Sequence, residues 1–233
     1  MNGLSGLLSR KDQMLNDGFT TEADFLHTPY RATAPFGKHA GELTGKRGFD
    51  LIASVIGLPV LAVLALVLLM VNPFYNRGPL FFFQIRMGRD CQPFRAIKFR
   101  TMQPVGLATR DVDAPLEVER ITRLGGLLRS ARIDEIPQIL NVLLGQMSII
   151  GPRPDFYGHA EHFLKVVPGY RERHLVRPGI SGLAQTEIGY VEGAVATRAK
   201  VNADLYYIVN RGWRLELWIV WRTLAVIFRR EGV

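Results

Sequence analysis

The chain has 233 residues, a length that allows one compact domain with appendages and leaves little room for a second. Hydrophobic residues make up 48% and charged residues 21%, a composition that excludes wholesale disorder. Lys and Arg number 29 against 21 Asp and Glu, and the resulting net charge of +8 favours polyanionic partners, namely nucleic acid, acidic lipid headgroups or phosphorylated small molecules.

Residues 1–45 are the first distinct segment. They are rich in Gly, Thr, Ala and charged residues, show no sustained periodicity and contain Pro29 and Pro35. This composition predicts a loosely ordered leader without a catalytic role.

Residues 46–75 carry the strongest compositional signal. The 21 residues from Leu51 to Val71 have no charge and are long enough, at about 1.5 Å per helical residue, to cross a hydrocarbon core of about 30 Å. A simple span carries its basic excess on one side, but here basic residues stand at both ends: Lys38, Lys46 and Arg47 before it, and Arg77, Arg86, Arg89, Arg95, Lys98 and Arg100 after it. Because Pro59 removes a backbone hydrogen bond, we predict a sharp bend there and a re-entrant membrane hairpin. An ordinary spanning helix with a tolerated kink is the alternative.

Residues 80–102 alternate apolar and basic side chains around a turn at 87–93, which predicts a short β-hairpin with one strongly cationic face. Arg86, Lys98 and Arg100 could bind a phosphate or a lipid headgroup there. A solvated strand face explains the same pattern equally well.

A helix is predicted from Leu116 to Leu128, and a second one after the acidic pair Asp134-Glu135. The second helix is indicated by apolar residues at helical spacing that end before Gly145: Ile136, Ile139, Leu140 and Leu143. Asp134 then falls at a helix N-terminus, where free amides and the helix dipole favour negative charge. On the plainest interpretation Asp134 is an N-cap, worth about 1 kcal/mol, and Glu135 is a favourable first-turn acid.

Two Pro/Gly loops follow, at residues 151–155 and 177–182. Each holds an arginine, Arg153 or Arg177, in a rigid turn of the kind that often binds substrates. Near the C-terminus, residues 215–228 form an apolar run that is too short to span a bilayer. All three tryptophans lie in or just before this run: Trp213, Trp218 and Trp221. This pattern predicts an interfacial helix with Arg229 and Arg230 reaching outward, and a buried core helix is the alternative.

Phosphoryl transfer is the chemistry that these residues fit best. It requires a nucleophile in line with phosphorus, a divalent cation on the diphosphate and cations around the equatorial oxygens. A carboxylate can attack phosphorus to give an acyl phosphate, and a neighbouring carboxylate can hold Mg²⁺, which prefers hard oxygen ligands. Asp134, Glu135 and the arginines around them supply these groups.

Rival catalytic patterns do not occur in the sequence. It contains no GxSxG elbow, no HExxH helix and no GxGxxG loop, and its five histidines follow no metal-ligand spacing. The single cysteine, Cys91, excludes an intramolecular disulfide and a cysteine-rich zinc module, and nothing indicates secretion. Asp111-Val-Asp113 stands in a polar stretch and is interpreted as a solvated loop.

Seven motifs stand in a fixed order: Lys46-Arg-x-Phe-Asp50, Gln84-x-Arg86-x-Gly88, Lys98-Phe-Arg-Thr-Met102, Asp134-Glu-x-Pro-Gln138, Asn141-Val-Leu-x-Gly-x-Met-Ser148, Gly151-Pro-Arg-Pro154 and Arg177-Pro-Gly-Ile-Ser-Gly182. In order and spacing they resemble the bacterial sugar transferase family, the monotopic phosphoglycosyl transferases. The resemblance covers about residue 46 to the C-terminus.

The resemblance implies an enzyme that moves a sugar 1-phosphate from a UDP-sugar to undecaprenyl phosphate and releases UMP, as the first membrane step of exopolysaccharide or related glycan assembly. It implies that Asp134 is the nucleophile that becomes phosphoglycosylated and that Glu135 helps to bind Mg²⁺. The further substrate-binding candidates are Arg86, Lys98, Arg100, Arg153, Arg177 and Gln185. The enzyme is expected on the cytoplasmic face of the bacterial inner membrane.

Two positions depart from the family pattern. The family commonly breaks its membrane helix at a Ser-Pro pair, whereas Leu58 precedes Pro59 here and this proline lies about one helical turn early. After Gly182 the family often continues through Trp-Gln, whereas this chain has Ala184-Gln185, which bears on the sugar or nucleotide contact.

We therefore expect a mostly α-helical α/β fold with a leader at 1–45, a re-entrant membrane helix at 46–75 and a catalytic domain at 76–233, similar to the minimal catalytic type of the family. Expected partners are a UDP-sugar, a polyprenyl phosphate and membrane lipids, without nucleic acid, and a homodimer is left open. Two alternatives remain: a membrane-anchored basic binding protein without catalysis, and a glycosyltransferase that moves only the sugar and releases UDP.

Overall fold

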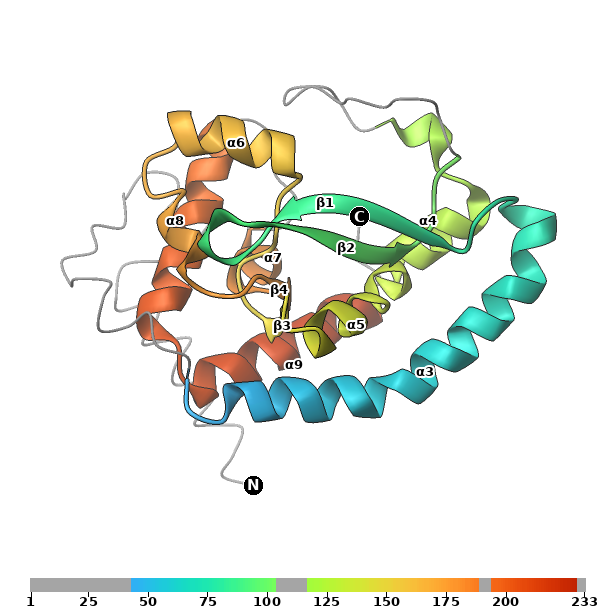
Figure 1. Cartoon of the computed structure of the whole chain (residues 1–233), viewed down its shortest axis with the longest axis horizontal. Coiled ribbons are helices and arrows are strands. Elements are labelled where there is room, and N and C mark those ends of the chain that lie inside the picture. The colour runs from blue at the N-terminus through green and yellow to red at the C-terminus, as the bar shows by residue number, and fades with distance from the viewer. Residues whose placement is uncertain (1–42, 104–116, 189–193, 230–233) are drawn as a thin grey trace.

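The computed structural model describes residues 43–103, 117–188 and 194–229, and these are mostly helical with two small sheets (Figure 1). The helices and strands in chain order are α3 Lys46–Tyr75, β1 Phe81–Met87, β2 Pro93–Phe99, α4 Arg123–Ser130, α5 Gln138–Leu143, β3 Ser148–Ile150, α6 Tyr157–Val166, β4 Gly179–Ser181, α7 Leu183–Glu187, α8 Ala194–Asn210 and α9 Trp213–Arg229. Four short 3-10 turns join them: η2 Arg89–Cys91, η3 Val118–Arg120, η4 Ile133–Glu135 and η5 Glu172–Leu175. The predicted mostly helical class is confirmed, whereas nearly all of the predicted leader and the 111–113 stretch lie outside the described residues.

Helix α3 is 30 residues long and is the one helix in the described ranges that is long and apolar enough to cross a membrane by length and composition. It buries one narrow face against the rest of the protein, made of Lys46, Asp50, Ser54, Leu61, Leu68 and Asn72. Its other faces expose large apolar side chains, among them Ile56, Val63, Met70 and Phe74. Figure 1 shows the helix axis changing direction about half-way along, which agrees with the backbone hydrogen bond that Pro59 removes. The helix is bent, but its two halves do not fold back against each other.

Strands β1 and β2 form the predicted antiparallel hairpin, in a register that runs from Phe81↔Phe99 to Met87↔Pro93. The turn passes through Asp90 and Cys91, which both have positive φ. Directly opposite residues in an antiparallel pair point to the same face, so Lys98 shares a face with its partner Phe82 and with Arg86, four positions further along β1.

A second sheet, which the sequence patterns did not predict, pairs β3 and β4 in parallel. The two Pro/Gly loops lie against each other there, backbone to backbone. A Cβ at Gly179 would stand 2.1 Å from the Gly151 nitrogen, and one at Gly182 would stand 2.2 Å from the Gly151 oxygen. Glycine is therefore required at this contact, which brings both arginine loops to one place.

The helix predicted from Leu116 to Leu128 is wrong in its extent. The described chain has η3, a break at Ile121 and Thr122, and then α4, whose N-terminus is capped by Thr122 Oγ1 accepting from the Gly125 amide at 2.9 Å. A capping residue has extended dihedrals and not helical ones, so Thr122 interrupts the predicted helix and α4 begins after it. The predicted second helix begins at Gln138 instead of Ile136, because η4 precedes it.

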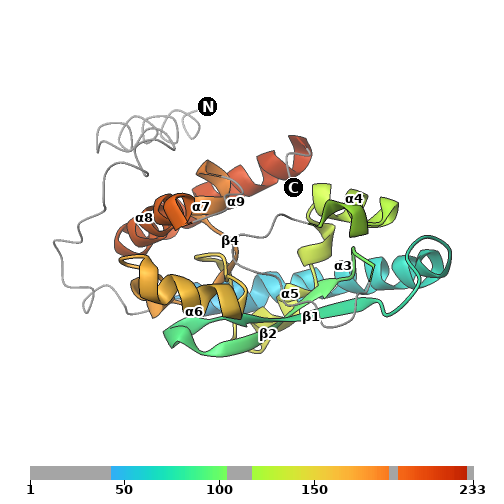
Figure 2. The same ribbon diagram turned by 90° about the horizontal axis from the view of Figure 1, so that it is seen from above.

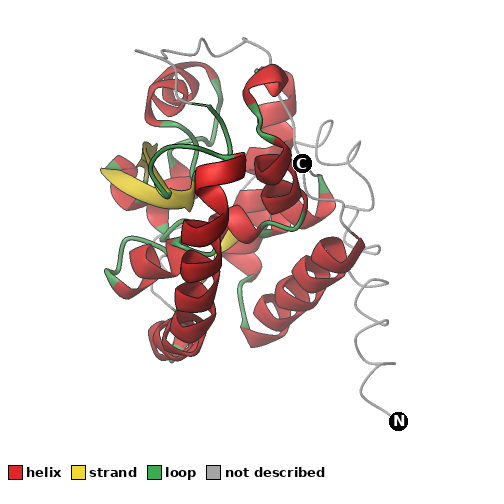
Figure 3. Ribbon diagram, turned by 90° about the vertical axis from the view of Figure 1, so that its right-hand side faces the viewer, coloured by secondary structure: helices red, strands yellow, loops and turns green. Residues whose placement is uncertain are grey.

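The largest apolar core joins α6, α8 and α9 to the end of β1, through residues that include Met87, Phe163, Tyr170, Ile208 and Ile219. A second core packs α3 and α5 around Phe99. Figure 2 shows α8 and α9 on the side of the molecule opposite the β1–β2 hairpin, and Figure 3 shows that helices make up most of the described chain.

Helix α9 combines the two alternatives drawn from its sequence. One face is buried through Leu215, Glu216 and Ile219, while Trp213, Leu217, Trp221 and Leu224 form an exposed apolar stripe at helical spacing. The helix is therefore neither wholly buried nor wholly polar on its outer face. The side chains of Arg229 and Arg230 lie outside the described residues.

Candidate active site

The acidic pair lies in η4, at the point where the chain turns from α4 into α5. Arg132, the residue before this turn, has a left-handed backbone with φ 55°, which a non-glycine residue adopts only when its surroundings impose it. Asp134 and Glu135 are both buried, at 8% and 5% exposure. The N-cap of α5 is Pro137 and that of η4 is Arg132, so Asp134 is not the capping residue that the plainest interpretation of the sequence assigned.

Glu135 is held by two cations from distant parts of the chain. Lys98 Nζ on β2 donates to Glu135 Oε1 at 2.6 Å, and the Arg153 guanidinium donates to both carboxylate oxygens, with Nη1 to Oε2 at 3.0 Å. A fork of this kind fixes orientation as well as charge. Burial alone would raise the pKa of Glu135, but Arg153 and Lys98 hold that pKa well below its usual range. Glu135 is therefore an ionised and immobilised carboxylate.

Asp134 has the opposite surroundings. No hydrogen bond to its carboxylate occurs among the residues that the structure describes. Burial raises the pKa of Asp134, the nearby Lys98 charge opposes this, and the Glu135 charge adds to it. Of two adjacent carboxylates, one is thus bonded to cations through both of its oxygens, and the other accepts no hydrogen bond from the described residues.

Lys98 faces the same site. Burial lowers its pKa to about 8, although the Glu135 charge acts in the other direction. An ammonium has three N–H groups, so the bond to Glu135 leaves Lys98 further donor capacity toward an anion.

Arg86 lies beside the loop of Arg153. Its Nη1 donates to the Pro154 oxygen at 2.5 Å, and its Nε and Nη2 donate to Gln84 Oε1 at 3.1 and 2.8 Å. These contacts place Arg86 at the edge of the site as a support of the loop.

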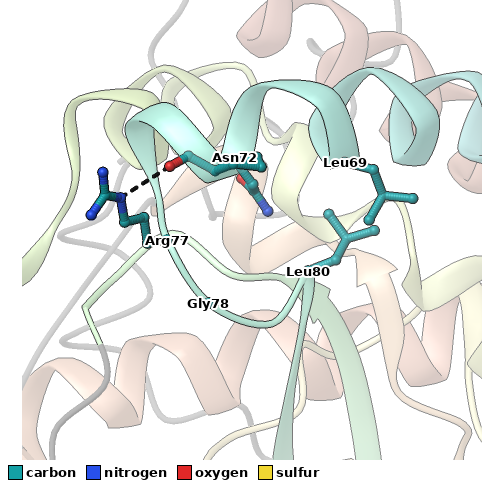
Figure 4. Close-up of a pocket in the computed structure, with 6 residues that line it drawn as sticks. Leu69, Asn72, Arg77, Gly78 and Leu80 are labelled. Atoms are coloured by element: carbon teal, nitrogen blue, oxygen red, sulfur yellow. Dashed lines mark hydrogen bonds between the residues drawn. The ribbon is translucent and has the colours of Figure 1, made fainter.

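Arg100 lies outside this cluster. Its Nε donates to the Pro79 oxygen at 2.8 Å and its Nη1 to Asn76 Oδ1 at 2.9 Å, while Asn76 Nδ2 donates back to the Arg100 oxygen at 2.7 Å. These bonds tie the end of α3 to β2. A cavity of about 350 Å³ opens at this end of α3, and Figure 4 shows Leu69 and Leu80 on one side of it and Arg77 on the other.

Arg177 and Gln185 also point elsewhere. Arg177 Nε donates to the Gly145 oxygen at 2.9 Å, and the side chain lines a small cavity with Lys46, Tyr207 and Glu216. Gln185, on α7, is buried with its Nε2 at 3.5 Å from the Ile180 oxygen and its Oε1 without a partner. The structure thus brings together Asp134, Glu135, Lys98, Arg153 and Arg86, and leaves Arg100, Arg177 and Gln185 outside that group.

The comparison with known families agrees with this geometry. The chain matches the model described as bacterial sugar transferase over residues 41–230. It belongs to the bacterial sugar transferase family.

Three relatives of this chain illustrate the range of the family. It is 41% identical over 192 residues to the UDP-N-acetylgalactosamine-undecaprenyl-phosphate N-acetylgalactosaminephosphotransferase of Aeromonas hydrophila, covering 80% of this chain and 44% of the relative. It is 37% identical to the UDP-glucose:undecaprenyl-phosphate glucose-1-phosphate transferase of Klebsiella pneumoniae, covering 78% and 38%. It is 36% identical to the exopolysaccharide production protein PSS of Rhizobium leguminosarum bv. phaseoli, covering 79% and 95%. The chain therefore spans less than half of the first two relatives and nearly all of the third.

Sequence reasoning missed one group of charged residues in this chain. Asp155, Arg173, Lys200 and Asp204 form a largely buried ionic cluster at the end of the loop of Arg153. One signal was available, because Lys200 and Asp204 stand four residues apart on a helix and therefore on one face.

Proposed function

We propose that this protein transfers a sugar 1-phosphate from a UDP-sugar to a polyprenyl phosphate such as undecaprenyl phosphate, releasing UMP, through a covalent intermediate on Asp134. One observation carries the proposal: Glu135 is locked by Lys98 and Arg153, while the adjacent Asp134 is buried yet has no hydrogen-bonding partner in the described chain. Two of the relatives carry names that state transfer to undecaprenyl phosphate, from UDP-N-acetylgalactosamine in one and from UDP-glucose in the other.

The first step would be attack of an Asp134 oxygen on the phosphorus next to the sugar. The bond from that phosphorus to the bridging oxygen breaks, the electron pair leaves on UMP, and an acyl phosphate joins the sugar to Asp134. In the second step a phosphate oxygen of the polyprenyl acceptor attacks the same phosphorus. The bond to Asp134 breaks, the carboxylate is restored and the sugar leaves as a polyprenyl diphosphate derivative.

The cations beside the pair would stabilise the charge that gathers on the transferred phosphoryl group. Lys98 and Arg153 are already oriented by Glu135, so they need little reorganisation when a diphosphate arrives. Arg86 would act through the loop that it supports, because its Nη1 is engaged by the Pro154 oxygen. Arg100 is not part of this proposal, since its contacts join α3 to β2.

The residues present fit Mg²⁺ in chemical type. Glu135 offers hard carboxylate oxygens next to Asp134, and an oxygen that accepts one hydrogen bond keeps a further lone pair. No group of three or more metal-binding side chains occurs in the described ranges, so the remaining ligands would come from the diphosphate and water. When bound, the ion would offset the negative charge of the diphosphate.

The membrane setting is also part of the proposal. We infer that α3 enters the bilayer from the cytoplasmic side and returns to it, because basic residues flank it at both ends and its outer face is apolar. The exposed stripe of α9, with Trp213 and Trp221, would lie at headgroup depth.

Cysteine labelling in intact cells tests this topology. In a Cys91→Ser background, single cysteines placed before and after α3 should both be labelled only when the reagent reaches the cytoplasm. Pro59→Ala should straighten the helix and expose one flank to a reagent that cannot cross the membrane. Unchanged placement of both flanks in Pro59→Ala would count against a hairpin set by this proline.

The reaction is tested with detergent-solubilised protein, Mg²⁺, undecaprenyl phosphate and a panel of UDP-sugars, by assay for UMP. UMP release that requires both the lipid and Asp134 supports the proposal, and the donor that works identifies the sugar. Asp90→Asn, at the exposed hairpin turn, is the matched control and should behave as wild type. Release of UDP would point to a sugar-only transferase, and no release with any donor would favour a binding protein.

A further inference from the structure

The loop from Gly151 to Asp155 is held through four successive carbonyl oxygens. The Pro152 oxygen accepts from the Gly179 amide at 2.9 Å and the Asp155 oxygen from the Met87 amide at 3.1 Å. Between them, the Arg153 oxygen accepts from Arg173 Nη2 at 2.8 Å and the Pro154 oxygen from Arg86 Nη1. A backbone fixed at every residue leaves the Arg153 side chain little freedom except its own rotamers.

The Arg153 oxygen accepts its hydrogen bond from a side chain and not from a backbone amide. The donor is Arg173, which lies in η5. Its side chain is fully buried, with 1% of the residue exposed. The guanidinium divides its donors among three acceptors: Nε to Asp204 Oδ2 at 2.8 Å, Nη1 to Asp155 Oδ2, and Nη2 to the Arg153 oxygen. A planar fork can reach all three at once, which a lysine ammonium could not reproduce.

The rest of the cluster holds Arg173 in that position. Asp155 also accepts from Tyr170 Oη at 2.7 Å and from Lys200 Nζ, and Asp204 stands on α8 four residues after Lys200. Two carboxylates thus balance two cations in the interior, where an unpaired charge would be strongly disfavoured. These contacts fix the Arg173 guanidinium, and its Nη2 donates to the Arg153 oxygen.

We propose that Arg173 is a positioning residue of the transfer reaction: by holding the carbonyl oxygen of Arg153, it aims that guanidinium at Glu135 and so keeps the acidic pair in its reactive arrangement. This inference rests on the proposed function. Arg173 contacts neither member of the acidic pair, and its influence reaches Glu135 through the loop that carries Arg153.

The test is a double-mutant cycle on single-turnover UMP release with Arg173→Gln, Arg153→Gln and the double variant. Arg173→Gln should lower the single-turnover rate constant by about 10- to 100-fold, because small misplacements of a catalytic group carry such costs. It should lower kcat with little change in KM for the UDP-sugar and retain the full burst amplitude. In the Arg153→Gln background the Arg173→Gln change should have almost no further effect.

Additive effects in the cycle, or a reduced burst amplitude with a wild-type rate constant, would overturn the proposal, because both indicate a structural role only. Tyr207→Phe is the matched control: it removes a buried hydroxyl bond to Glu216 at 2.6 Å and should leave the rate constant unchanged. If Arg173→Gln does not fold, Arg173→Lys replaces it in the same cycle, with the same criteria. A wild-type protein that releases no UMP with any donor contradicts the proposed function itself, whereas an active wild type with an additive cycle contradicts only this inference.

Discussion

The loop from Gly151 to Asp155 contributes to two clusters of buried charge that differ in how completely they are paired. In the cluster around Asp155, two carboxylates meet two cations and a tyrosine hydroxyl. In the cluster around Glu135, two carboxylates also meet cations, but the bonds all go to Glu135 and none to Asp134 among the described residues. Complete pairing suits a structural support, and an unpaired carboxylate beside fixed cations suits a nucleophile.

Asp134→Asn removes the unpaired carboxylate and should have the largest effect on activity. An amide is a poor nucleophile, so we expect turnover to fall by about 10³-fold or more while the fold and membrane association persist. UMP release, circular dichroism and flotation with liposomes measure the three properties. Substantial activity in the purified variant would refute Asp134 as the nucleophile.

Arg153→Gln disturbs the partly paired cluster without removing a carboxylate. Glu135 loses its fork and keeps Lys98, so we expect kcat to fall by about 10²-fold. Steady-state kinetics of the purified, monodisperse variant measures this. A loss confined to KM would instead assign Arg153 to ground-state binding of the donor.

The two clusters should also respond oppositely to pH. Burial alone would raise the pKa of Asp155, but Lys200 and Arg173 hold it below its usual range, so the stability it contributes is present above its unfolded-state pKa and is lost as pH falls through the folded value. Burial raises the pKa of Asp134, so its ionisation opposes folding as pH rises.

Urea unfolding from pH 7 down to about pH 2 separates these contributions, because the Asp155 contribution changes only below the ordinary Asp pKa of about 3.9. Asp155→Asn should lower the free energy of unfolding at pH 7 by about 3 kcal/mol, because it leaves buried cations without their partner. Asp134→Asn should leave that free energy unchanged or raise it. Equal losses in both variants would mean that the two carboxylates are equally paired in solution.

Tyr170→Phe should have the smallest effect. It removes one hydrogen bond to Asp155 and retains the ionic contacts, so we expect a loss of about 1.5 kcal/mol in unfolding free energy. The rate constant of UMP release should not change, because the Arg173 contact to Arg153 remains. A slower release would show that the hydroxyl also takes part in aiming Arg153.

Features with a local signature were predictable from the sequence. The uncharged run predicted α3, alternation of apolar and basic residues predicted the β1–β2 hairpin, and a run of motifs singled out Asp134, Glu135 and Arg153, which the structure places together. Each depends on neighbours within a few residues, which is the range that periodicity and motif spacing report.

The contacts that each arginine side chain makes were not predictable from such local patterns. Arg86, near the turn of the hairpin, and Arg100, just after β2, belong to the same alternating stretch of sequence, yet one supports the loop of Arg153 and the other clamps the end of α3. The partners that decide this are distant in sequence, as Lys98 and Glu135 are, 37 residues apart. A charge pattern along a strand shows which residues can bind an anion, and tertiary packing decides which of them already have a partner.

The central claim is most directly tested by mass spectrometry of the intact protein after incubation with the UDP-sugar and Mg²⁺ in the absence of any polyprenyl phosphate. The account predicts a mass increase equal to one sugar phosphate, with UMP released in equal amount, a modified peptide that contains Asp134, and loss of the added mass when undecaprenyl phosphate is supplied. Full turnover in the complete assay without any such adduct, or an adduct on another residue, would contradict it.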